Sequence, residues 1–297
     1  MARLLGSAAG AARGLRERFD AGEMVLAPGC SDALGARLVE EAGFSAVYMT
    51  GFGSAAARLG RPDVGLMTLP EMVDNAHRIA AAVDIPLVAD ADTGYGNSIN
   101  VIRTVHEYEA AGVAAIHLED QVMPKKCGHM SGKQVVPAAE MAAKVSAAVA
   151  ARRSPEFLII ARTDARAVEG LEAAIMRAQL YRDAGADVLF VEAPQSETEI
   201  ETVARAFPDV PLLFNYAEGG KTPPLGYERL RELGFSLVIF PLTLLLSATS
   251  AMRGALARVK ADGTPIELLP SLPAFDEFLE FIGLPEIEEL EQRFAEG

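Results

Sequence analysis

The sequence has few cysteines, no long apolar run and fewer positive than negative charges. Two cysteines in 297 residues, Cys30 and Cys127, exclude a disulfide framework and indicate a reducing, cytoplasmic setting. No stretch reaches the ~20 consecutive apolar residues of a transmembrane helix, and the first residues lack the apolar core of a signal peptide. The chain carries 27 Lys and Arg against 41 Asp and Glu, a formal charge of −14 that repels nucleic acid and anionic lipid. This composition argues against a nucleic-acid or membrane partner.

Apolar residues make up 50% of the chain, which is enough to bury a large core and excludes intrinsic disorder. Short apolar runs alternate with amphipathic segments about every 30 residues, a pattern that predicts parallel βαβ units. The runs expected to form strands are Met24–Gly29, Ser45–Thr50, Ile85–Asp92, Ala114–Asp120, Phe157–Asp164, Ala186–Ala193, Pro211–Ala217 and Ser236–Leu242. The segments expected to form helices are Asp32–Ala42, Pro70–Val83, Ser98–Ala111, Ala138–Ala151, Glu169–Ala184, Ser196–Ala206, Leu225–Leu233 and Leu244–Lys260. Eight such units indicate an α/β fold of the (β/α)₈ TIM-barrel type, with a doubly wound sheet as the alternative.

The composition changes near the C-terminus. Prolines there punctuate two predicted helices, Phe275–Ile282 and Pro285–Phe294. The first of these carries apolar residues at helical spacing, so its apolar face must pack either on the barrel or on a neighbouring subunit. We therefore expect a single domain over residues 1–297, with the barrel over about 20–260 and a C-terminal helical extension over about 261–297.

Polar residues gather where the predicted strands end, which is the active-site face of a β/α barrel. These residues are Tyr48, Thr50, Asp90, Asp92, His117, Glu119, Arg162, Asp164, Glu192 and Asn215. Because side chains alternate along a strand, Asp90 and Asp92 are expected to share one face. Grouped carboxylates repel one another unless a cation lies between them, and oxygen ligands suit Mg²⁺ or Mn²⁺ rather than Zn²⁺. The pair therefore predicts a metal site, although any single one of these residues has a helix cap or loop charge as its alternative role.

The loop after the fourth predicted strand combines a cysteine, a histidine and three lysines. Cys127 precedes His129 by two residues, and Lys125, Lys126 and Lys133 flank the pair. A positive field lowers the pKa of a thiol, so Cys127 is expected to serve as a nucleophile or a proton donor. Glycines in the same segment indicate a loop that moves as a lid. The alternative is a solvated basic loop around a small buried cysteine.

Two other features are given simpler interpretations. The segment Gly51–Ala56 follows a predicted strand and resembles a dinucleotide fingerprint. We reject that interpretation because Gly60–Asp63 breaks the helix such a fingerprint opens, and because no acidic strand end follows about 20 residues later. A loop that binds a carboxylate through backbone N–H groups is the preferred interpretation. Cys30, at the end of the first predicted strand, is interpreted as a packing residue.

Several motifs together resemble the isocitrate lyase/phosphoenolpyruvate mutase superfamily. The motifs are Pro28-Gly, Asp32-Ala-Leu, Asp90-Ala-Asp-Thr-Gly-Tyr-Gly96, Leu118-Glu-Asp-Gln121, Lys125-Lys-Cys-Gly-His129, Ala161-Arg-Thr-Asp164, Val191-Glu-Ala-Pro194 and Asn215 with Glu218-Gly-Gly220. They follow in order from about Leu15 to the C-terminus. The motif with the cysteine is typical of the lyase branch, because the mutases lack that cysteine.

The resemblance implies a modified (β/α)₈ barrel whose last helix is exchanged between subunits, in a homotetramer built from dimers. It also implies a Mg²⁺-dependent lyase that cleaves the C2–C3 bond of a 2-hydroxy dicarboxylate or tricarboxylate. Asp90 would ligate the metal, and Asp92 and Glu119 would hold its waters. Mn²⁺ is the alternative metal.

The resemblance further implies roles for individual residues. Cys127 would act as general acid, Arg162 would bind a substrate oxygen, and Tyr48 is the candidate base. The residues expected to bind substrate are Thr50, Gly51, Phe52, Gly128, His129, Glu192 and Asn215.

Within the lyase branch the chain looks most similar to 2,3-dimethylmalate lyases, whose products are pyruvate and propionate. Methylisocitrate lyases usually carry an arginine where this chain has Met130, and isocitrate lyases proper contain extra segments that this chain lacks. A methylisocitrate lyase releasing pyruvate and succinate is one alternative, and an oxaloacetate hydrolase or decarboxylase on the same scaffold is another. A barrel that binds a dicarboxylate and a metal without turnover is the alternative of a different class.

Overall fold

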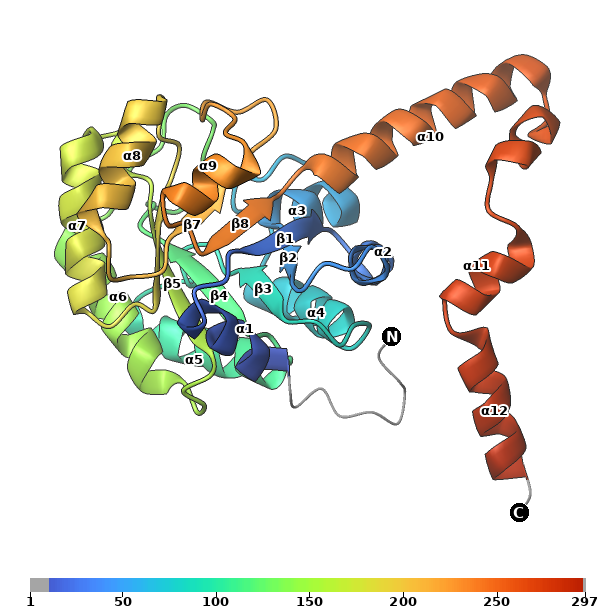
Figure 1. Ribbon diagram of the computed structural model, residues 1–297, viewed down its shortest axis with the longest axis horizontal. Helices are drawn as coiled ribbons and strands as arrows, with labels where there is room; N and C mark the ends of the chain where they lie inside the picture. The colour runs from blue at the N-terminus through green and yellow to red at the C-terminus, as the bar shows by residue number, and fades with distance from the viewer. Residues whose placement is uncertain (1–10, 296–297) are drawn as a thin grey trace. The chain divides into compact units, whose positions relative to one another are not determined.

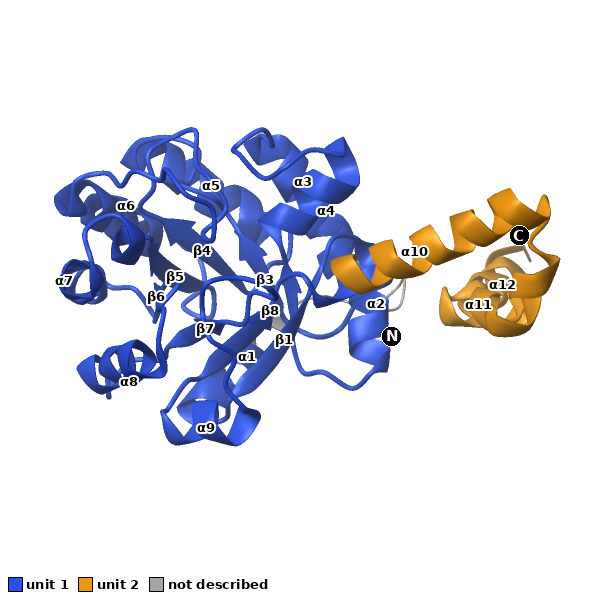
Figure 2. Ribbon diagram, turned by 90° about the horizontal axis from the view of Figure 1, so that it is seen from above, with its two compact units in different colours: residues 1–2, 7–244 blue, residues 3–6, 245–297 orange. Residues whose placement is uncertain are grey.

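The computed structural model (Figure 1) describes residues 11–295, which form two compact units (Figure 2). The first unit ends at Leu244 and the second begins at Leu245. Helix α10 (Thr243–Asp262), which we expected within a barrel reaching about residue 260, is therefore mostly part of the second unit. Among the residues described, no helix has both the length and the apolar character needed to cross a membrane.

The first unit is a parallel eight-stranded sheet that curls into a barrel with its helices on the outside (Figure 1). The strands are β1 (Val25–Cys30), β2 (Val47–Met49), β3 (Leu87–Asp90), β4 (Ala115–Glu119), β5 (Leu158–Thr163), β6 (Val188–Val191), β7 (Leu213–Asn215) and β8 (Leu237–Phe240). Their order is β6-β5-β4-β3-β2-β1-β8-β7, and a bridge between Leu189 and Leu212 links the two ends of that order. Strands adjacent in the chain are adjacent in the sheet, so the barrel prediction is confirmed and the doubly wound alternative is wrong.

The segments expected to form helices do so, and further helical segments join them. In the first unit they are α1 (Ala11–Asp20), α2 (Ala33–Glu41), α3 (Gly51–Leu59), α4 (Leu69–Ala80), α5 (Ser98–Ala110), α6 (Ala138–Ala151), the 3₁₀ turn η1 (Ala165–Ala167), α7 (Leu171–Asp183), α8 (Glu197–Ala206) and α9 (Tyr227–Glu232). Helix α3 stands where we expected a loop. Thr50 caps it by accepting a hydrogen bond from the Gly53 N–H at 3.2 Å, and Gly60 ends it in the left-handed conformation.

Because successive side chains of each strand point to opposite faces of the sheet, the barrel unit has two apolar cores. The larger core lies between the sheet and the helices, and the smaller one fills the barrel with Val25, Ala27, Val88, Ile160, Leu213 and Leu237 among others. The strand register places Asp90 beside His117, and Glu119 beside Arg162, at the carboxyl ends of β3, β4 and β5. Tyr48 belongs to the inner core on β2. The alternation that fills the barrel thus also brings these polar side chains to its mouth.

The second unit contains helix α10 and, after the 3₁₀ segment η2 (Ile266–Ser271), the helices α11 (Phe275–Phe281) and α12 (Leu284–Ala295). Phe275 is 75% exposed in the single chain, and Leu256 and Ile266 are also exposed. The unit therefore carries apolar surface, as the sequence predicts for this segment.

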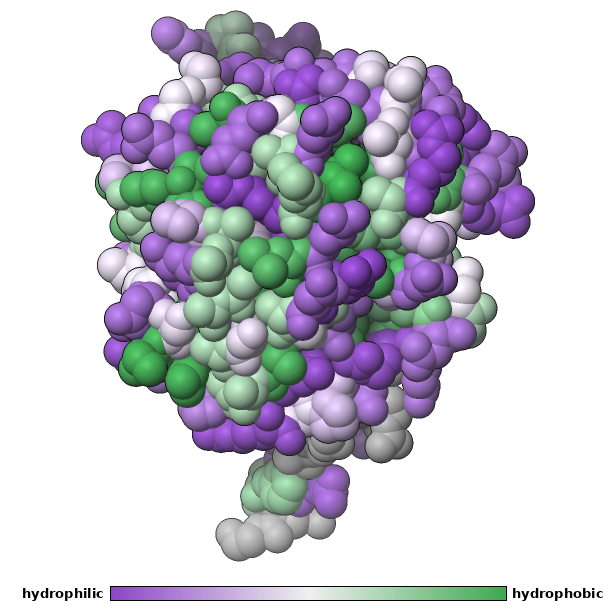
Figure 3. All heavy atoms as spheres, turned by 90° about the vertical axis from the view of Figure 1, so that its left-hand side faces the viewer, coloured by the Kyte–Doolittle hydropathy of each residue, from purple (hydrophilic) through white to green (hydrophobic). Residues whose placement is uncertain are grey.

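The outer surface of the barrel carries apolar side chains as well. Green side chains gather on the face that carries α7 (Figure 3), where Met176 and Leu180 are exposed at helical spacing. The apolar surface is thus present on both units.

Candidate active site

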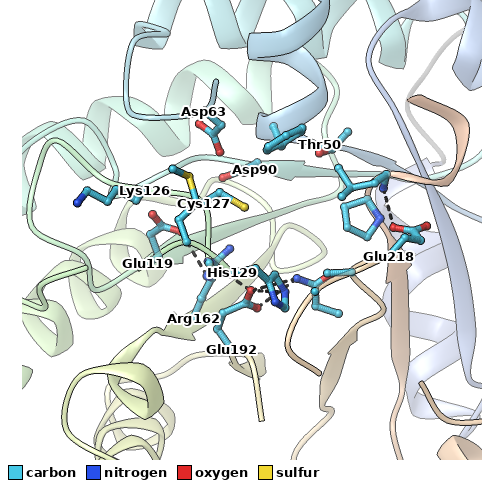
Figure 4. A pocket seen from close by; sticks show the side chains of 18 of the residues that line it. Thr50, Asp63, Asp90, Glu119, Lys126, Cys127, His129, Arg162, Glu192 and Glu218 are labelled. Atoms are coloured by element: carbon cyan, nitrogen blue, oxygen red, sulfur yellow. Dashed lines mark hydrogen bonds and ion pairs between the residues drawn. The ribbon is translucent and has the colours of Figure 1, made fainter. Parts of the chain in front are cut away.

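A cavity of about 250 Å³ opens at the carboxyl ends of the barrel strands (Figure 4). Strand ends and the loops after β4, β7 and β8 form its wall. The predicted site residues on the wall are Tyr48, Thr50, Phe52, Asp90, Glu119, Cys127, Gly128, His129, Arg162, Glu192 and Asn215. Gly51 and Asp92 are the predicted residues that do not line it. The cavity is therefore the candidate active site.

Tyr48 and His117 form a buried hydrogen bond of 2.8 Å between Oη and Nε2. His117 Nε2 also lies 3.6 Å from Asp90 Oδ1. Burial lowers the pKa of His117 to about 4, so its imidazole is neutral at pH 7. Burial raises the pKa of Tyr48 well above 10, so its phenol keeps the proton. Tyr48 is thus no phenolate base by itself, and His117 is placed to accept its proton.

Arg162 is the central cation of the site (Figure 4). Its guanidinium binds Asp164 through two hydrogen bonds, Nε to Oδ2 at 2.9 Å and Nη2 to Oδ1 at 3.1 Å. Arg162 Nε lies 3.3 Å from Glu119 Oε2, and Nη2 lies 3.7 Å from Glu192 Oε1. The guanidinium also stacks 5.0 Å from the ring centre of Phe190. Its orientation is therefore fixed from several sides.

Glu192, after β6, joins the barrel to the loop that carries His129. Asn215 Nδ2 lies 3.2 Å from both Glu192 oxygens, and His129 Nε2 lies 3.1 Å from Glu192 Oε1. His129 Nδ1 accepts the Lys221 backbone N–H at 3.0 Å, which places the proton of the neutral ring on Nε2, toward Glu192. Burial raises the pKa of Glu192, but Arg162 and His129 outweigh it and bring that pKa well below its usual value. Glu192 is therefore an ionised carboxylate.

Cys127 lines the cavity, and its thiol differs from our expectation. Burial, together with the negative charges of Glu192 and Asp63, raises its pKa above the ordinary value of 9.0, although the His129 backbone N–H and Arg162 act in the opposite direction. The predicted lowering by flanking lysines is wrong, because burial outweighs the positive charges. Cys127 therefore remains a thiol at neutral pH, which suits a proton donor better than a nucleophile.

Lys125, which we expected to supply positive charge to the site, is occupied by two carboxylates. Its Nζ lies 2.6 Å from Asp63 Oδ2 and 2.6 Å from Asp92 Oδ1, and its side chain is 2% exposed. β3 ends at Asp90, and Asp92 beyond it has a φ of 48°. Asp90 lines the cavity and Asp92 does not, so only Asp90 of the predicted pair reaches the wall.

The start of α3 reaches the cavity, with Thr50 and Phe52 on the wall. The Gly53 and Ser54 N–H groups are bonded to Thr50, and the free N–H groups that remain in a helix's first turn can bind an anion. A Cβ on Gly51 would lie 2.3 Å from Asp90 Oδ2, so only glycine allows α3 to begin this close to β3. The interpretation as a carboxylate-binding segment therefore has a helix N-terminus, rather than a loop, as its physical basis.

The acidic residues of the wall fit a hard divalent cation held mostly through water. Among residues 11–295, no three acidic, histidine or cysteine side chains converge on one point, so a metal would have few direct protein ligands. Glu119 Oε1 is buried without a hydrogen-bond partner, and burial raises the pKa of that carboxyl well above 4.5. Asp90 remains ionised, because surrounding charges, among them Lys125, outweigh its burial. Mg²⁺ characteristically takes one or two carboxylates and keeps several waters.

Two further residues, Asp63 and Glu218, belong to the site through contacts between segments distant in the chain, which the sequence alone did not indicate. Asp63 lies on the wall, binds Lys125, and its carbonyl accepts the Cys127 backbone N–H at 3.2 Å. Glu218 accepts hydrogen bonds from the Leu242 N–H, at 3.1 Å, and from the Thr243 hydroxyl. Asp63 was noted only as part of a helix-breaking segment. A contact with Cys127 across more than sixty residues leaves no local pattern.

Comparison with known proteins agrees with this geometry. The family model described as phosphoenolpyruvate phosphomutase matches residues 15–260. The chain belongs to the phosphoenolpyruvate mutase/isocitrate lyase superfamily. The superfamily prediction is therefore confirmed, and with it the resemblance that the Lys125–His129 motif carries.

Members of this superfamily match over almost the whole chain. The 2,3-dimethylmalate lyase of Eubacterium barkeri is 46% identical over 95% of this chain and 98% of its own length. The 2-methylisocitrate lyase of Aeropyrum pernix is 45% identical over 92% of this chain and 88% of its own. A crystal structure of phosphonopyruvate hydrolase in complex with oxalate and Mg²⁺ matches with a TM-score of 0.88 and 32% identity, over 96% of this chain and 99% of that one.

Proposed function

We propose that this protein is a Mg²⁺-dependent carbon–carbon lyase that cleaves 2,3-dimethylmalate, or a similar 2-hydroxy dicarboxylate, to pyruvate and propionate. The observation that carries the proposal is a half-buried thiol, Cys127, on the wall of a cavity that also holds Asp90 and Arg162. A thiol that stays protonated is the group needed to deliver a proton to a carbanion. The 46% identity to a 2,3-dimethylmalate lyase supports the substrate.

Substrate binding follows from the donors on the wall. The 2-hydroxy acid end would lie against the N-terminus of α3, where the free N–H groups near Phe52 accept a carboxylate. The carboxylate on C3 would lie near Gly128 and His129, with Glu192 and Asn215 orienting the histidine. Arg162 would hold the C2 oxygen.

The cleavage needs one proton removed and one delivered. Loss of the proton from the C2 hydroxyl allows the C2–C3 bond to break, so that C2 becomes the keto carbon of pyruvate. The electron pair of that bond passes to C3 and its carboxylate, forming an enolate that takes the Cys127 Sγ proton and becomes propionate. The C2 hydroxyl proton passes to Tyr48 as Tyr48 gives its own to His117 Nε2, along their 2.8 Å hydrogen bond. The proton left on His117 then returns through solvent to the Cys127 thiolate, which restores both groups and completes the cycle.

Asp90 would hold Mg²⁺ directly, and Glu119 and Asp92 would hold waters of its shell; Mn²⁺ would suit the same oxygens. When bound, the cation would stabilise negative charge on the substrate's 2-oxygen. The unpartnered Glu119 Oε1 supports this assignment. Asp92 would reach such a water only beside Lys125, which now lies 2.6 Å from its Oδ1.

The test is a substrate panel of 2,3-dimethylmalate, methylisocitrate, isocitrate and oxaloacetate, each with and without Mg²⁺. Pyruvate release is followed with lactate dehydrogenase and NADH, and the second product is identified by NMR. Pyruvate with propionate from dimethylmalate supports the proposal. Turnover of none of the four acids would favour a barrel that binds a dicarboxylate without cleaving it.

Methylisocitrate is the second candidate substrate, because a 2-methylisocitrate lyase is 45% identical to this chain. Its third carboxylate would need a cation at position 130, where this chain places Met130 on the cavity wall. Pyruvate with succinate from methylisocitrate, at a higher kcat/KM than dimethylmalate, would overturn our choice of substrate. An oxaloacetate hydrolase or decarboxylase would be recognised in the same panel by acetate with oxalate, or by pyruvate with CO₂.

We further propose that the protein acts in the cytoplasm as a homotetramer of two dimers, in which the second unit is exchanged between subunits. The exposed Phe275 and Leu256 support this assembly, since apolar surface of this kind is normally covered by a partner. Sedimentation equilibrium of the full chain and of a variant ending at Leu244 tests it. A monomeric full chain would contradict it.

A further inference from the structure

Lys133 is a buried cation that the proposed reaction does not use. It stands at the end of the segment 125–133, the loop that carries Cys127, and its side chain is 2% exposed. Its Nζ donates hydrogen bonds to the Gly128 carbonyl and, at 2.7 Å, to Asp164 Oδ1. A buried ammonium is costly unless it is paired, so this lysine strongly favours the conformation in which both acceptors are in reach.

The Asp164 carboxylate that pairs with Lys133 also orients Arg162. Both of its oxygens accept hydrogen bonds from the Arg162 guanidinium, at 2.9 Å and 3.1 Å. Its own position is fixed from behind, because its backbone N–H donates to Asp120 Oδ1 at 2.8 Å and Asp120 also accepts the Tyr181 hydroxyl at 2.8 Å. Asp164 thus binds both Lys133 of the loop and Arg162 of the barrel, and its own position is fixed by Asp120.

We propose that Lys133 is a positioning residue, which fastens the Cys127 loop to the same carboxylate that orients Arg162. Gly128 follows Cys127 directly, so a carbonyl held at Gly128 fixes the backbone one residue from the thiol. Through Asp164 the position of Cys127 and the orientation of Arg162 depend on one another. The consequence for turnover rests on the proposed function, whereas the consequence for access to the thiol does not.

The direct test measures how fast Cys127 reacts with 5,5′-dithiobis(2-nitrobenzoate) in the full-length Lys133→Met protein. Released from Asp164, the loop should expose Cys127, and we expect labelling at least tenfold faster than in the wild type. Removing a cation does not lower the pKa of a thiol, so faster labelling reports access. Peptide mass spectrometry separates Cys127 from the buried Cys30.

The matched control is Gln134→Ala, at the next residue, whose side chain is exposed. Labelling of Cys127 in that variant should stay within twofold of the wild type. Labelling of Lys133→Met less than tenfold faster than the wild type would overturn the proposal, and Lys133 would then merely neutralise Asp164. Asp164 keeps its Arg162 partner in the variant, which favours folding, and a melting curve checks this. Should Lys133→Met not fold, Lys133→Gln takes its place under the same tenfold criterion.

Turnover provides the second measurement. A positioning role predicts that Lys133→Met lowers kcat at least tenfold with less than a threefold change in KM, and that Lys133→Arg, which keeps the charge, recovers part of kcat. Equal effects on KM and kcat would overturn the role in catalysis. If the wild type cleaves none of the panel acids while labelling accelerates as expected, the proposed function fails and the loop attachment stands.

Discussion

Gly128→Ala is the substitution whose effect the structure determines most directly. A Cβ at position 128 would lie 2.1 Å from Glu192 Oε1 and 2.4 Å from Arg162 Nη2, where an ordinary contact needs at least 3.4 Å. Glu192 and Arg162 are held by Asn215 and Asp164, so the loop has to move, by about 1 Å. A misplacement of that size costs on the order of 10² in rate when it displaces a reacting group. We expect kcat/KM to fall about 100-fold.

The assay is pyruvate release from 2,3-dimethylmalate, together with a melting curve. The melting temperature should fall modestly, because the segment 125–133 lies outside both apolar cores but its shift loosens the contact between Lys133 and the Gly128 carbonyl. Gly226→Ala is the control: a Cβ there meets nothing within 4 Å, and the residue has a φ of −70° that alanine adopts freely. Wild-type kcat/KM in Gly128→Ala would refute the reasoning, because it would show that the reaction uses a different loop position from this one.

Three other variants or conditions test the proposed chemistry. Cys127→Ser should keep KM and lower kcat by about 10²–10⁴, the usual contribution of a general acid, as measured by pyruvate release; an unchanged kcat would remove Cys127 from the mechanism. The fall of kcat at high pH should lie above pH 9, because the thiol form donates the proton and burial raises its pKa above 9.0; a fall below pH 9 would assign the acid to another group. Asp90→Asn should abolish both activity and the rise in melting temperature that Mg²⁺ gives the wild type; an unchanged rise would place the metal elsewhere.

The strands of the fold were predictable because each is a short apolar run bounded by turn residues, buried on both sides. Helix α3 was not, because Gly51 and Gly53 lower helix propensity and resemble a phosphate-binding loop. Two facts outweigh that local pattern: the Thr50 cap, and the close approach of Gly51 to Asp90. The second is a contact between two strand ends, which a single segment does not reveal.

The sequence was enough to predict many of the residues that line the site. It was not enough to predict their ion pairs and pKa shifts. Strand ends of a barrel meet at one mouth, so Tyr48, Glu119 and Arg162 could be brought together from alternation alone. Alternation does not show the partner of Asp92, whose Oδ1 lies 2.6 Å from Lys125 Nζ across more than thirty residues of the chain. The sign of the Cys127 pKa shift was missed for a related reason: counting lysines in a sequence does not show which of them are already paired.

That pairing decides how an anionic substrate can bind here. Lys125 is balanced by Asp63 and Asp92, and Lys133 by Asp164. Arg162 is in turn shared among the side chains of Glu119, Asp164 and Glu192, so most of its charge is neutralised before a substrate enters, although it can still donate a hydrogen bond to the C2 oxygen. A dicarboxylate entering this cavity would therefore meet a wall whose positive charge is mostly paired, with the N-terminus of α3 and Lys126, which donates to the Ser131 and Gly132 carbonyls, as the donors not balanced by a carboxylate. A divalent cation on Asp90 would reverse that balance, so we expect the metal to be required for binding the keto acid as well as for the cleavage.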